Sequence, residues 1–405
     1  MTGKRVNLLL AVLVAAALLV PLSAGAAEKT FKIGLALSFS GPTGAWGKIF
    51  SQGDKMVADH FNAQGGLNIG GERYKIELIE ADNKFTAEGG ASAARRLIEK
   101  DKVNLVHGGL VTQDTLGVQE VTEPAKMISM TTGAADEVIN SGDGKKYSFR
   151  AYISYSETFP TMMRWFFKRF PDKKRIALLD MNYDSAWRAH ELMRKLAPKL
   201  GFEIVYNEFY EGGTKDFFPF LSKAMTTKPD VFMNLASPPP DWALRIKQAR
   251  QLGFKGKFLE CHPLELSTMA PIAGAENLEG LMGYDYVIDG PGSNEATQAF
   301  KKAYLDKYGK WDPFAILVGG PLAALLMAYE KAGSLDSDKV LAVIKEDVTW
   351  ETFTGLTGIF GGVSRYGRAA QWLSPQYMQI AEKGRAVPQL TDGKISIKDM
   401  LHGWD

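Results

Sequence analysis

Apolar and polar positions along this chain predict short buried strands, each followed by a loop and an amphipathic helix. The stretch 31–39 has alternating and then continuous apolar residues, which is typical of a strand buried in a parallel sheet. The pattern breaks at 40–44, and apolar residues at helical spacing follow over 53–64. Trp46 lies in the loop between them, where it either meets a ligand or caps a core. Because ligands bind outside the carboxyl ends of strands in open α/β sheets, this loop is a candidate binding element.

The same unit recurs along the chain. Further strands are expected at 74–82, 103–106 and 127–130, with helices over 88–101 and from 112 onward. From 149 the order restarts, with strands at 175–180, 202–210, 231–236 and 257–261 and helices at 157–170, 185–200, 217–226 and 242–252. Helices are then expected at 295–308, 313–332 and 337–345, and a strand at 376–381. Strand and helix alternation predicts two α/β domains, each with a doubly wound parallel sheet, although the two halves share no detectable sequence repeat.

Size and charge narrow the class of protein. The chain has 405 residues, of which 45% are hydrophobic, enough for two cores. Its 48 basic and 46 acidic residues are interspersed and leave a net charge of +2. This balance gives no electrostatic footprint for nucleic acid.

The N-terminus predicts export. Lys4 and Arg5 precede an apolar run over 8–20 and small residues over 23–27, the order expected of a secretory signal peptide spanning 1–27. The alternative, an uncleaved membrane anchor, is disfavoured because the run is short for a bilayer core of about 30 Å. Cys261 is the one cysteine, so no intramolecular disulfide forms and no cysteine in the leader carries a lipid. We expect a soluble periplasmic protein that is not a lipoprotein.

Several pieces of the mature chain resemble a known family. They are, in order, KIGLALSFSGPTGAWG, FNAQGGLNIGG, AARRLIEKDKVNLVHGG, GFEIVYNEFYEGGTKDFFPFLSKAM, PDVFMNLASPPPDWALRIKQARQLGF, IAGAENLEGLMGYDY and GLTGIFGG. Together they are similar to type I periplasmic binding proteins, in particular the leucine/isoleucine/valine-binding family of ABC-transporter substrate-binding proteins. The resemblance implies an α/β fold of two Rossmann-like lobes joined by three hinge crossovers, near 149–151, 278–284 and 352–360. Lobe 1 would then hold 28–150 plus 284–351, and lobe 2 would hold 151–283 plus 352–405.

The resemblance also implies a function. Such a protein binds a branched-chain or hydrophobic amino acid, or a related small carboxylate, in the cleft between its lobes. It then delivers this solute to an ABC permease without chemical change, as a monomer and with no cofactor. An aromatic or aliphatic carboxylate that is not an amino acid is the alternative ligand.

Besides Trp46, four candidate site residues lie on the first lobe. Thr112 matches a family position whose hydroxyl meets the ligand carboxylate, although a threonine there is also an ordinary helix cap. Gly133 matches a position that uses its backbone. Ala135 matches a position that usually offers a hydroxyl, so Gln113 or the threonines at 131 and 132 would have to replace that contact.

His262 is the main departure from the family pattern. It falls where the branched-chain amino-acid binders have a glutamate that faces the ligand ammonium. A neutral imidazole accepts one hydrogen bond, but it supplies no negative charge. Glu260 and Glu265 lie close in sequence, and a shifted alignment would restore the acid. Alternatively, His262 is a loop histidine without contact to the ligand.

Aromatic residues complete the expected site. Tyr183 matches a position that closes over the ligand, and Tyr155 follows the first crossover, where it could equally cover the hinge. Ser237 is the nearest polar residue to Pro238, which stands where an aromatic is common. With Trp46, the two tyrosines would line a flat apolar slot that suits an aromatic or aliphatic carboxylate as well as leucine or phenylalanine.

An enzyme and a ligand sensor are the two alternative classes of function. For an enzyme, the five histidines show no metal-ligand spacing, and Cys261 and His262 point to opposite faces of a strand, so they form no dyad. A ligand-sensing module for a membrane signalling partner would use the same fold. The residues do not separate sensing from transport.

Overall fold

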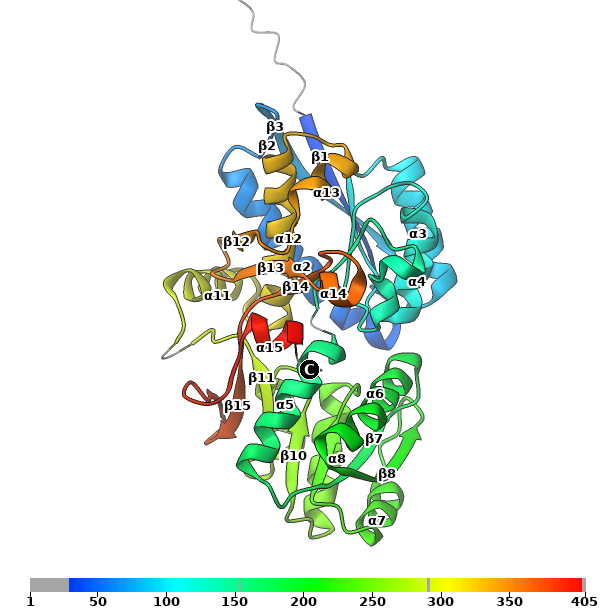
Figure 1. The fold of residues 1–405 in the computed structure, drawn as a ribbon, viewed down its shortest axis with the longest axis vertical. Helices are drawn as coiled ribbons and strands as arrows, with labels where there is room; N and C mark the ends of the chain where they lie inside the picture. Colours follow the sequence, from blue (N-terminus) through cyan, green and yellow to red (C-terminus); the bar gives the residue numbers. More distant parts are fainter. Residues whose placement is uncertain (1–28, 153, 290–291, 403–405) are drawn as a thin grey trace, which may run out of the picture.

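Two mixed α/β lobes lie end to end along the long axis of the computed structural model, which describes residues 29–152, 154–289 and 292–402 (Figure 1). The first sheet has the strand order β12-β13-β14-β6-β5-β4-β1-β3-β2. Its central strands run parallel, whereas β2, β12 and β13 are antiparallel to their neighbours. The strands are β1 (Lys29–Leu37), β2 (Leu67–Ile69), β3 (Glu72–Asp82), β4 (Leu105–Gly108), β5 (Ser129–Thr131), β6 (Ser148–Arg150), β12 (Thr349–Glu351), β13 (Thr357–Gly361) and β14 (Gln371–Leu373).

The first-lobe helices cover both faces of this sheet. Helices α2, α12 and α13 lie on one side and α3 and α4 on the other, as Figure 1 shows. The helical elements are η1 (Gly41–Thr43), α2 (Gly44–Ala63), α3 (Ala87–Arg95), η2 (Arg96–Lys100), α4 (Thr112–Thr122), η3 (Asp136–Val138), η4 (Ser141–Asp143), α11 (Glu295–Tyr308), α12 (Phe314–Ala332), α13 (Ser337–Val343) and α14 (Val363–Tyr366). The doubly wound parallel arrangement is as predicted.

Helix α2 begins earlier than the sequence pattern indicated. It starts at Gly44, so Trp46 lies in its first turn and not in a loop, which corrects the expected helix start at 53. Gly47 permits this early start, because a Cβ at this position would lie 1.9 Å from the backbone oxygen of Ser38. The end of β1 and the start of α2 are therefore in backbone contact, and Trp46 sits at the carboxyl edge of the sheet.

The second lobe repeats the plan with a smaller sheet, ordered β16-β15-β11-β10-β9-β7-β8, with β17 paired to β15. Helices α5, α6 and α15 pack on one face, and α7, α8 and α9 pack on the other. The strands are β7 (Arg175–Met181), β8 (Glu203–Tyr210), β9 (Val231–Asn234), β10 (Lys257–Glu260), β11 (Met282–Asp285), β15 (Gln376–Glu382), β16 (Arg385–Pro388) and β17 (Lys394–Ile395). The helices are α5 (Tyr155–Arg169), α6 (Asp184–Leu200), α7 (Phe218–Thr226), α8 (Pro239–Gln251), α9 (Leu266–Ala273), α10 (Ala275–Leu278) and α15 (Ile397–His402).

Helix α12 is the apolar centre of the first lobe. Among the described residues it is the one helix long and apolar enough to cross a membrane, but 78% of that window is buried inside the protein. It packs along α2, where a Cβ at Gly53 would lie 2.6 Å from the backbone oxygen of Ala315. Its composition is therefore explained by burial in the lobe core.

The chain passes between lobes three times, and two of the crossings differ from the expected positions. The first follows β6, close to the expected 149–151. The second follows β11, which pairs in the second sheet through Asp285, so it comes after the expected 278–284. The third lies between β14 and β15, at 374–375, whereas 352–360 was expected. The glycine-rich run that suggested the earlier crossing instead forms β13, because its apolar residues pair antiparallel to β12 and β14.

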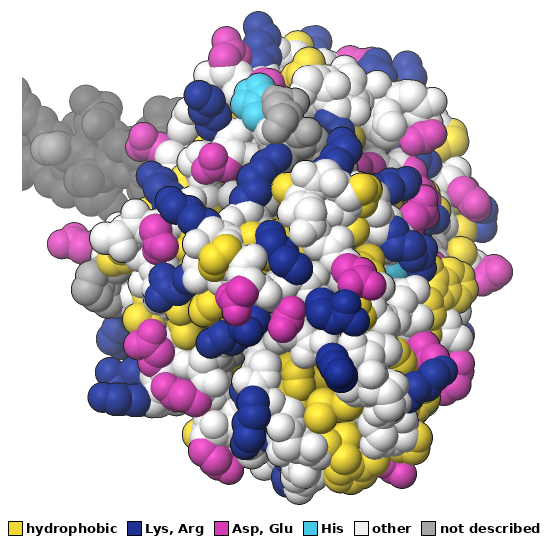
Figure 2. All heavy atoms as spheres, turned by 60° about the horizontal axis from the view of Figure 1, so that its bottom comes forward, with side chains coloured by type: hydrophobic (Ala, Val, Ile, Leu, Met, Phe, Trp, Pro, Cys, Tyr) yellow, Lys and Arg dark blue, Asp and Glu magenta, His cyan; other side chains and the backbone are white. Residues whose placement is uncertain are grey.

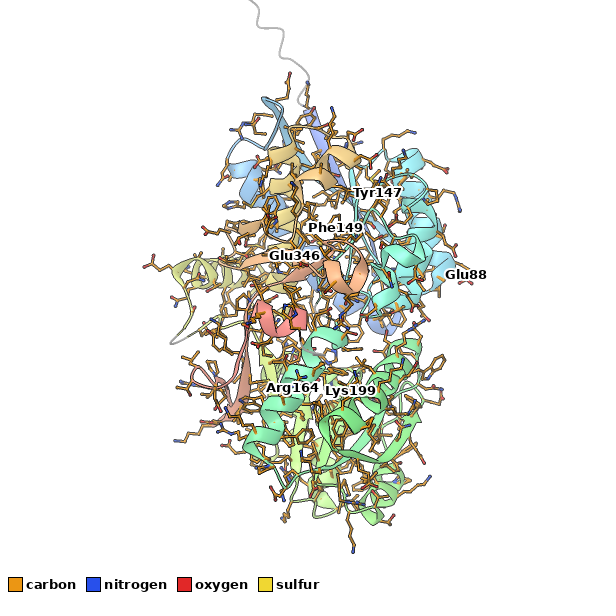
Figure 3. The ribbon with its side chains drawn as sticks, viewed as in Figure 1. Glu88, Tyr147, Phe149, Arg164, Lys199 and Glu346 are labelled. Carbon is orange, nitrogen blue, oxygen red and sulfur yellow. The ribbon has the colours of Figure 1, made fainter. Side chains whose placement is uncertain are left out.

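The surface agrees with the balanced composition. On the face shown in Figure 2, lysine and arginine side chains are interspersed with aspartate and glutamate. Figure 3 places Tyr147 and Phe149 in the first lobe, and Arg164 and Lys199 on helices of the second. The expected signal peptide, 1–27, lies outside the described residues.

Candidate functional site

A pocket lies between the two lobes at the carboxyl ends of both sheets. The space between its lining atoms is about 670 Å³, with the open solvent at its mouth included. Both lobes contribute loops that follow parallel strands, as open α/β sheets require. The lining residues are Trp46, Phe50, Leu110, Val111, Thr132, Ala134, Tyr152, Tyr155, Tyr183, Ser185, Ala236, Ser237, Pro239, Glu260, His262, Glu265 and Phe314.

The first-lobe wall is apolar. Trp46 and Phe50 lie four residues apart on α2 and therefore share one helix face. Phe50 in turn stacks on buried His107, with ring centroids 6.1 Å apart. Thr132 is the one polar residue type in this wall, but its hydroxyl donates to the backbone oxygens of Gly109 and Leu110 at 3.1 and 3.0 Å. This wall therefore keeps no free hydroxyl proton at Thr132 for a ligand.

Asp114 holds part of that wall in place. Its buried carboxylate accepts the backbone N–H groups of Leu110 and Val111 at 3.0 and 2.9 Å, and the side-chain amide of Asn83 at 2.7 Å. Burial raises the pKa of Asp114 to about 6, against the opposing effect of these donors. Hydrogen bonds to the Asp114 carboxylate thus fix the backbone of the loop after β4.

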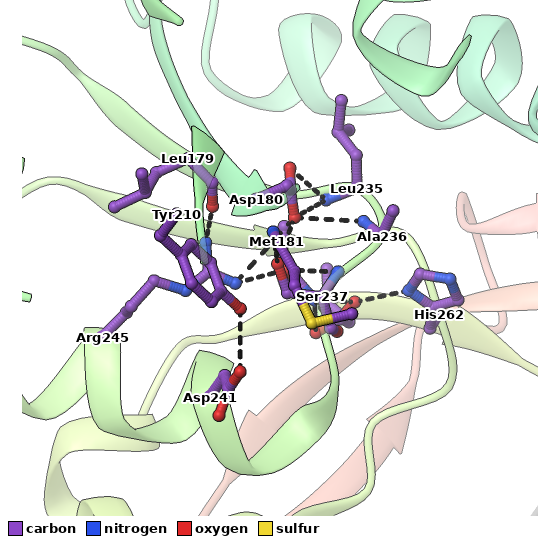
Figure 4. Close-up of polar contacts among 12 residues, drawn as sticks. Leu179, Asp180, Met181, Tyr210, Leu235, Ala236, Ser237, Asp241, Arg245 and His262 are labelled. Atoms are coloured by element: carbon purple, nitrogen blue, oxygen red, sulfur yellow. Dashed lines mark hydrogen bonds and ion pairs between the residues drawn. The ribbon is translucent and has the colours of Figure 1, made fainter. Parts of the chain in front are cut away.

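A second buried acid, Asp180 at the end of β7, organises the opposite wall (Figure 4). Its carboxylate accepts the Ser237 hydroxyl at 2.7 Å and contacts His190 Nε2 at 2.9 Å. Burial acts to raise the pKa of Asp180, but the hydrogen bond and charge of His190, with Arg245 and Ser237, lower it well below its usual range. The Ser237 hydroxyl therefore donates its hydrogen bond to Asp180, and its oxygen accepts the N–H of Met181 at 3.0 Å.

Glu260 and His262 form a pair at the end of β10. Residues two apart lie on the same side of an extended chain, and His262 Nδ1 is 2.9 Å from Glu260 Oε1. The side-chain amide of Asn234 donates to both Glu260 oxygens, at 3.0 and 3.1 Å. Burial raises the pKa of Glu260, and His262 and Asn234 oppose that rise. Cys261, between the two, is buried in the lobe core, and its carbonyl accepts the Tyr284 hydroxyl at 2.8 Å.

Glu265 is a third acid at the pocket. It precedes α9 and lines the pocket while remaining partly exposed. Burial, followed by the like charges of Asp312 and Glu260, raises the pKa of Glu265 to about 8, and Lys310 opposes this rise. At neutral pH its carboxyl group is therefore mostly protonated when the pocket holds no ligand.

Aromatic rings surround His262. The Tyr152 ring centroid lies 6.1 Å from that of His262, and the Tyr155 ring meets the same imidazole edge-on at 6.2 Å. Tyr152 also stacks on Phe314, with centroids 6.2 Å apart. Its hydroxyl is buried and has no hydrogen-bond partner within the described part of the chain. Because Tyr152 stands in the first crossover and Phe314 at the start of α12, this corner joins the hinge to both lobes.

Five of the nine predicted site residues line the pocket: Trp46, Tyr155, Tyr183, Ser237 and His262. The Tyr183 hydroxyl donates to the backbone oxygen of Ala236 at 2.5 Å. Tyr183 can therefore offer a ligand its ring but not its hydroxyl proton.

The other four lie outside the lining. Thr112 is fully buried, and its hydroxyl oxygen accepts the N–H of Ala135 at 3.3 Å. The N–H of Gly133 donates to Thr131 at 3.1 Å, and the amide of Gln113 donates to the backbone oxygen of Phe85 at 2.8 Å. Ligand contact by these four stays a prediction, while their neighbours Val111 and Ala134 border the pocket.

The sequence patterns missed several lining residues. Phe50 could have been found from its four-residue spacing to Trp46 once the early start of α2 was known. Tyr152 and Phe314 carry no local signal, because only the crossover geometry brings them together. Glu265, noted from sequence as a neighbouring acid, is in the lining.

The lobes also touch through residues outside the pocket lining. Arg188 on α6 pairs with Glu137 of η3 across 2.6 Å. Lys310 of the first lobe lies 3.4 Å from the hydroxyl of Thr268 on α9. Within residues 29–152, 154–289 and 292–402, no group of three or more histidine, cysteine, aspartate or glutamate side chains is arranged to hold a metal ion.

The family model described as periplasmic binding protein matches residues 30–376. The chain is a member of the periplasmic binding protein family. A leucine-, isoleucine-, valine-, threonine- and alanine-binding protein of Pseudomonas aeruginosa is 25% identical over 334 residues, 82% of this chain and 86% of that protein.

Solved periplasmic binding proteins share the fold. A leucine-binding protein from Thermotoga maritima superposes with a TM-score of 0.75 and 24% identity, covering 91% of this chain and all of that one. A solute-binding protein of an ABC transporter from Rhodopseudomonas palustris, in complex with 3,4-dihydroxybenzoic acid, superposes with a TM-score of 0.73 and 20% identity. The match covers 91% of this chain and 97% of that one. The resemblance and the fold class predicted from sequence are confirmed.

Proposed function

We propose that this chain is the periplasmic solute-binding component of an ABC importer, and that it binds a small carboxylated solute with a hydrophobic body. One observation carries the proposal: aromatic rings of both lobes border a single pocket. Trp46 and Phe50 come from the first lobe, and Tyr155 and Tyr183 come from the second. A ligand between them loses apolar surface on both sides, so its binding favours the form in which the lobes are together.

Relatives support two ligand classes. Those named for leucine, isoleucine and valine favour a hydrophobic amino acid, and the neighbour in complex with 3,4-dihydroxybenzoic acid favours an aromatic acid. The ring-lined walls suit either body. An aromatic acid is the second candidate because Glu260, the acid at the end of β10, already contacts His262 and Asn234.

Binding without chemical change, export and a monomeric state complete the proposal. Ligand recovered after long incubation should have an unchanged mass. The periplasmic protein should begin after Ala26 or Ala27, which N-terminal sequencing measures. Its mass in solution, by light scattering, should be that of one chain.

A thermal-shift screen tests the ligand class. Branched and aromatic amino acids, benzoates and short fatty acids are each added in excess to the purified mature protein. A ligand at a hundred times its dissociation constant stabilises the folded state by about 2.7 kcal/mol. A response to sugars or cationic solutes alone, with none to these carboxylates, would overturn the proposal.

A further inference from the structure

We propose that Tyr152 and His262 form the head-group site of the pocket, and that the group they bind is a carboxylate with no ammonium beside it. This inference rests on the proposed function, because it specifies which carboxylated solute the same pocket takes. It adds two specificity-determining residues and a positioning residue, Glu260.

The Tyr152 hydroxyl is the first observation. The residue is 7% exposed, lines the pocket, and leaves its hydroxyl without a partner among the described residues. A buried hydroxyl left unpaired is costly, so a ligand oxygen at this point removes that cost. Burial, followed by Tyr284, Tyr155 and Glu260, raises the pKa of Tyr152 well above its usual value, so it remains a proton donor across ordinary pH.

His262 supplies the second donor. Glu260 contacts Nδ1 at 2.9 Å, which leaves Nε2 as the ring nitrogen that can meet a ligand. Burial raises the pKa of Glu260, and a protonated Glu260 donates to Nδ1, so that the neutral ring carries its own proton on Nε2 and donates it to a ligand. The ring centroids of Tyr152 and His262 are 6.1 Å apart, so both donors border the same corner of the pocket.

Alternative carboxylate donors are scarce on the neighbouring elements. Helix α8 begins at the pocket with Pro239 and Pro240, which have no N–H to offer. The hydroxyls of Ser237 and Thr132 donate to Asp180 and to backbone oxygens, and the Ser185 hydroxyl, also in the lining, lies 3.5 Å from the carboxylate of Asp184. The head group of a ligand is therefore directed toward Tyr152 and His262.

An ammonium group finds little free negative charge at this corner. Glu260 is engaged by His262 and Asn234. Glu265 stands beside Asp312 and Glu260 and is mostly protonated at neutral pH, so its carboxyl group can donate to a ligand carboxylate instead of repelling it. The six rings of Trp46, Phe50, Tyr152, Tyr155, Tyr183 and Phe314 then favour an aromatic body.

Matched ligands that differ only in the ammonium group test the inference. Calorimetry at about pH 7 compares 3-phenylpropanoate with phenylalanine, and 4-methylpentanoate with leucine. We expect the acid without an ammonium to bind at least about ten-fold tighter in each pair. Tighter binding of the amino acid in either pair would overturn the head-group assignment and leave the proposed function intact, whereas failure of all four ligands and of benzoate would count against the proposed function itself.

Two substitutions locate the site. Tyr152→Phe removes only the hydroxyl, and His262→Gln removes the imidazole while keeping a polar side chain. Each should weaken 3-phenylpropanoate binding by about ten-fold or more, the usual effect of losing a charge-assisted hydrogen bond. Tyr206→Phe, a hydroxyl buried in the second lobe away from the pocket, is the matched control and should bind as the parent does. Unchanged affinity in either pocket variant, with 3-phenylpropanoate still bound, would overturn the role of that residue.

Discussion

Arg188 of the second lobe donates a hydrogen bond from Nη1 to Oε2 of Glu137 in the first lobe, across 2.6 Å. Both side chains are partly exposed and belong to different lobes, so the pair forms only when the lobes are together. Such a contact adds to the closed form and is absent from the open one. It therefore contributes to ligand affinity without touching the ligand.

Arg188→Gln should weaken ligand binding modestly. A partly exposed ion pair contributes about 0.2–1 kcal/mol, which corresponds to a change of about 1.4- to 5-fold in the dissociation constant. The loss should shrink as salt is raised, because salt already screens the pair in the parent. Lys195→Gln is the control, since it breaks the Lys195–Glu191 pair within the same helix. An equal effect of the two substitutions in calorimetry would show that no interlobe contact is involved.

Trp46→Ala should remove one wall of the pocket. If the indole packs on the ligand, binding should weaken by about 1–3 kcal/mol, or about 5- to 150-fold. Trp187→Ala provides a matched control, because that indole is 51% exposed and does not line the pocket. Calorimetry that gives Trp46→Ala the affinity of the parent would remove Trp46 from the site.

Glu265 should make stability depend on pH. Its pKa is about 8 in the folded protein, raised by burial and by Asp312 and Glu260 from an ordinary value of 4.5. The folded protein therefore holds this proton more tightly than the unfolded chain does. The resulting stabilisation is fully present below about pH 4.5 and is lost as the pH rises toward 8.

Thermal unfolding of Glu265→Gln checks that sign. The neutral amide cannot ionise. The melting temperature of the variant minus that of the parent should therefore be larger at about pH 8.5 than at about pH 5. The exposed Glu120→Gln serves as the control and should show the same difference at both values. A difference for Glu265→Gln that does not change with pH would contradict the expectation.

Arg150→Met should destabilise the protein through the hinge. The buried guanidinium donates to the Tyr366 hydroxyl at 2.7 Å and lies 3.6 Å from Glu157 of α5, which begins just after the first crossover. Removing the cation leaves the buried Glu157 carboxylate with the more distant Arg365, 3.8 Å away, as its remaining cation, so the loss should approach that of a broken buried ion pair, about 3–5 kcal/mol. Urea unfolding measures it.

The partner of that charge offers an internal check. Adding Glu157→Gln to Arg150→Met should restore part of the lost free energy, since the buried carboxylate is then neutral. Additive losses in the double variant would mean that the two groups do not interact. The same guanidinium also donates to the backbone oxygen of Ala134, a lining residue, so Arg150→Met should lower affinity as well.

Strand and helix alternation was enough to predict the two doubly wound lobes. The strand-end position predicts Trp46, whereas His262 is predicted by the family resemblance, and both line the pocket. The resemblance also predicts Thr112 and Gly133, but the hydroxyl of Thr112 and the N–H of Gly133 form hydrogen bonds within the first lobe. Which residue of a strand-end loop faces a ligand depends on backbone torsion in that loop, and a one-residue difference changes it.

Other parts of the site depend on contacts distant in sequence. Tyr152 meets Phe314 across 162 positions of chain, and neither follows a predicted strand in a recognisable motif. The late third crossover was missed because the run at 357–361 looks like a loop in sequence, while its neighbours β12 and β14 make it a strand. By contrast, the Glu260–His262 pair follows from two-residue alternation alone.

The isolation of Cys261 has an experimental consequence. The 405-residue chain carries no other cysteine, and this one lies fully buried between Glu260 and His262. Burial raises the pKa of the thiol far above its usual value, so it is unreactive until the strand end becomes exposed. The rate of alkylation of the natural protein therefore reports local opening of the second lobe. The protection that a bound solute adds can be followed without any engineered label.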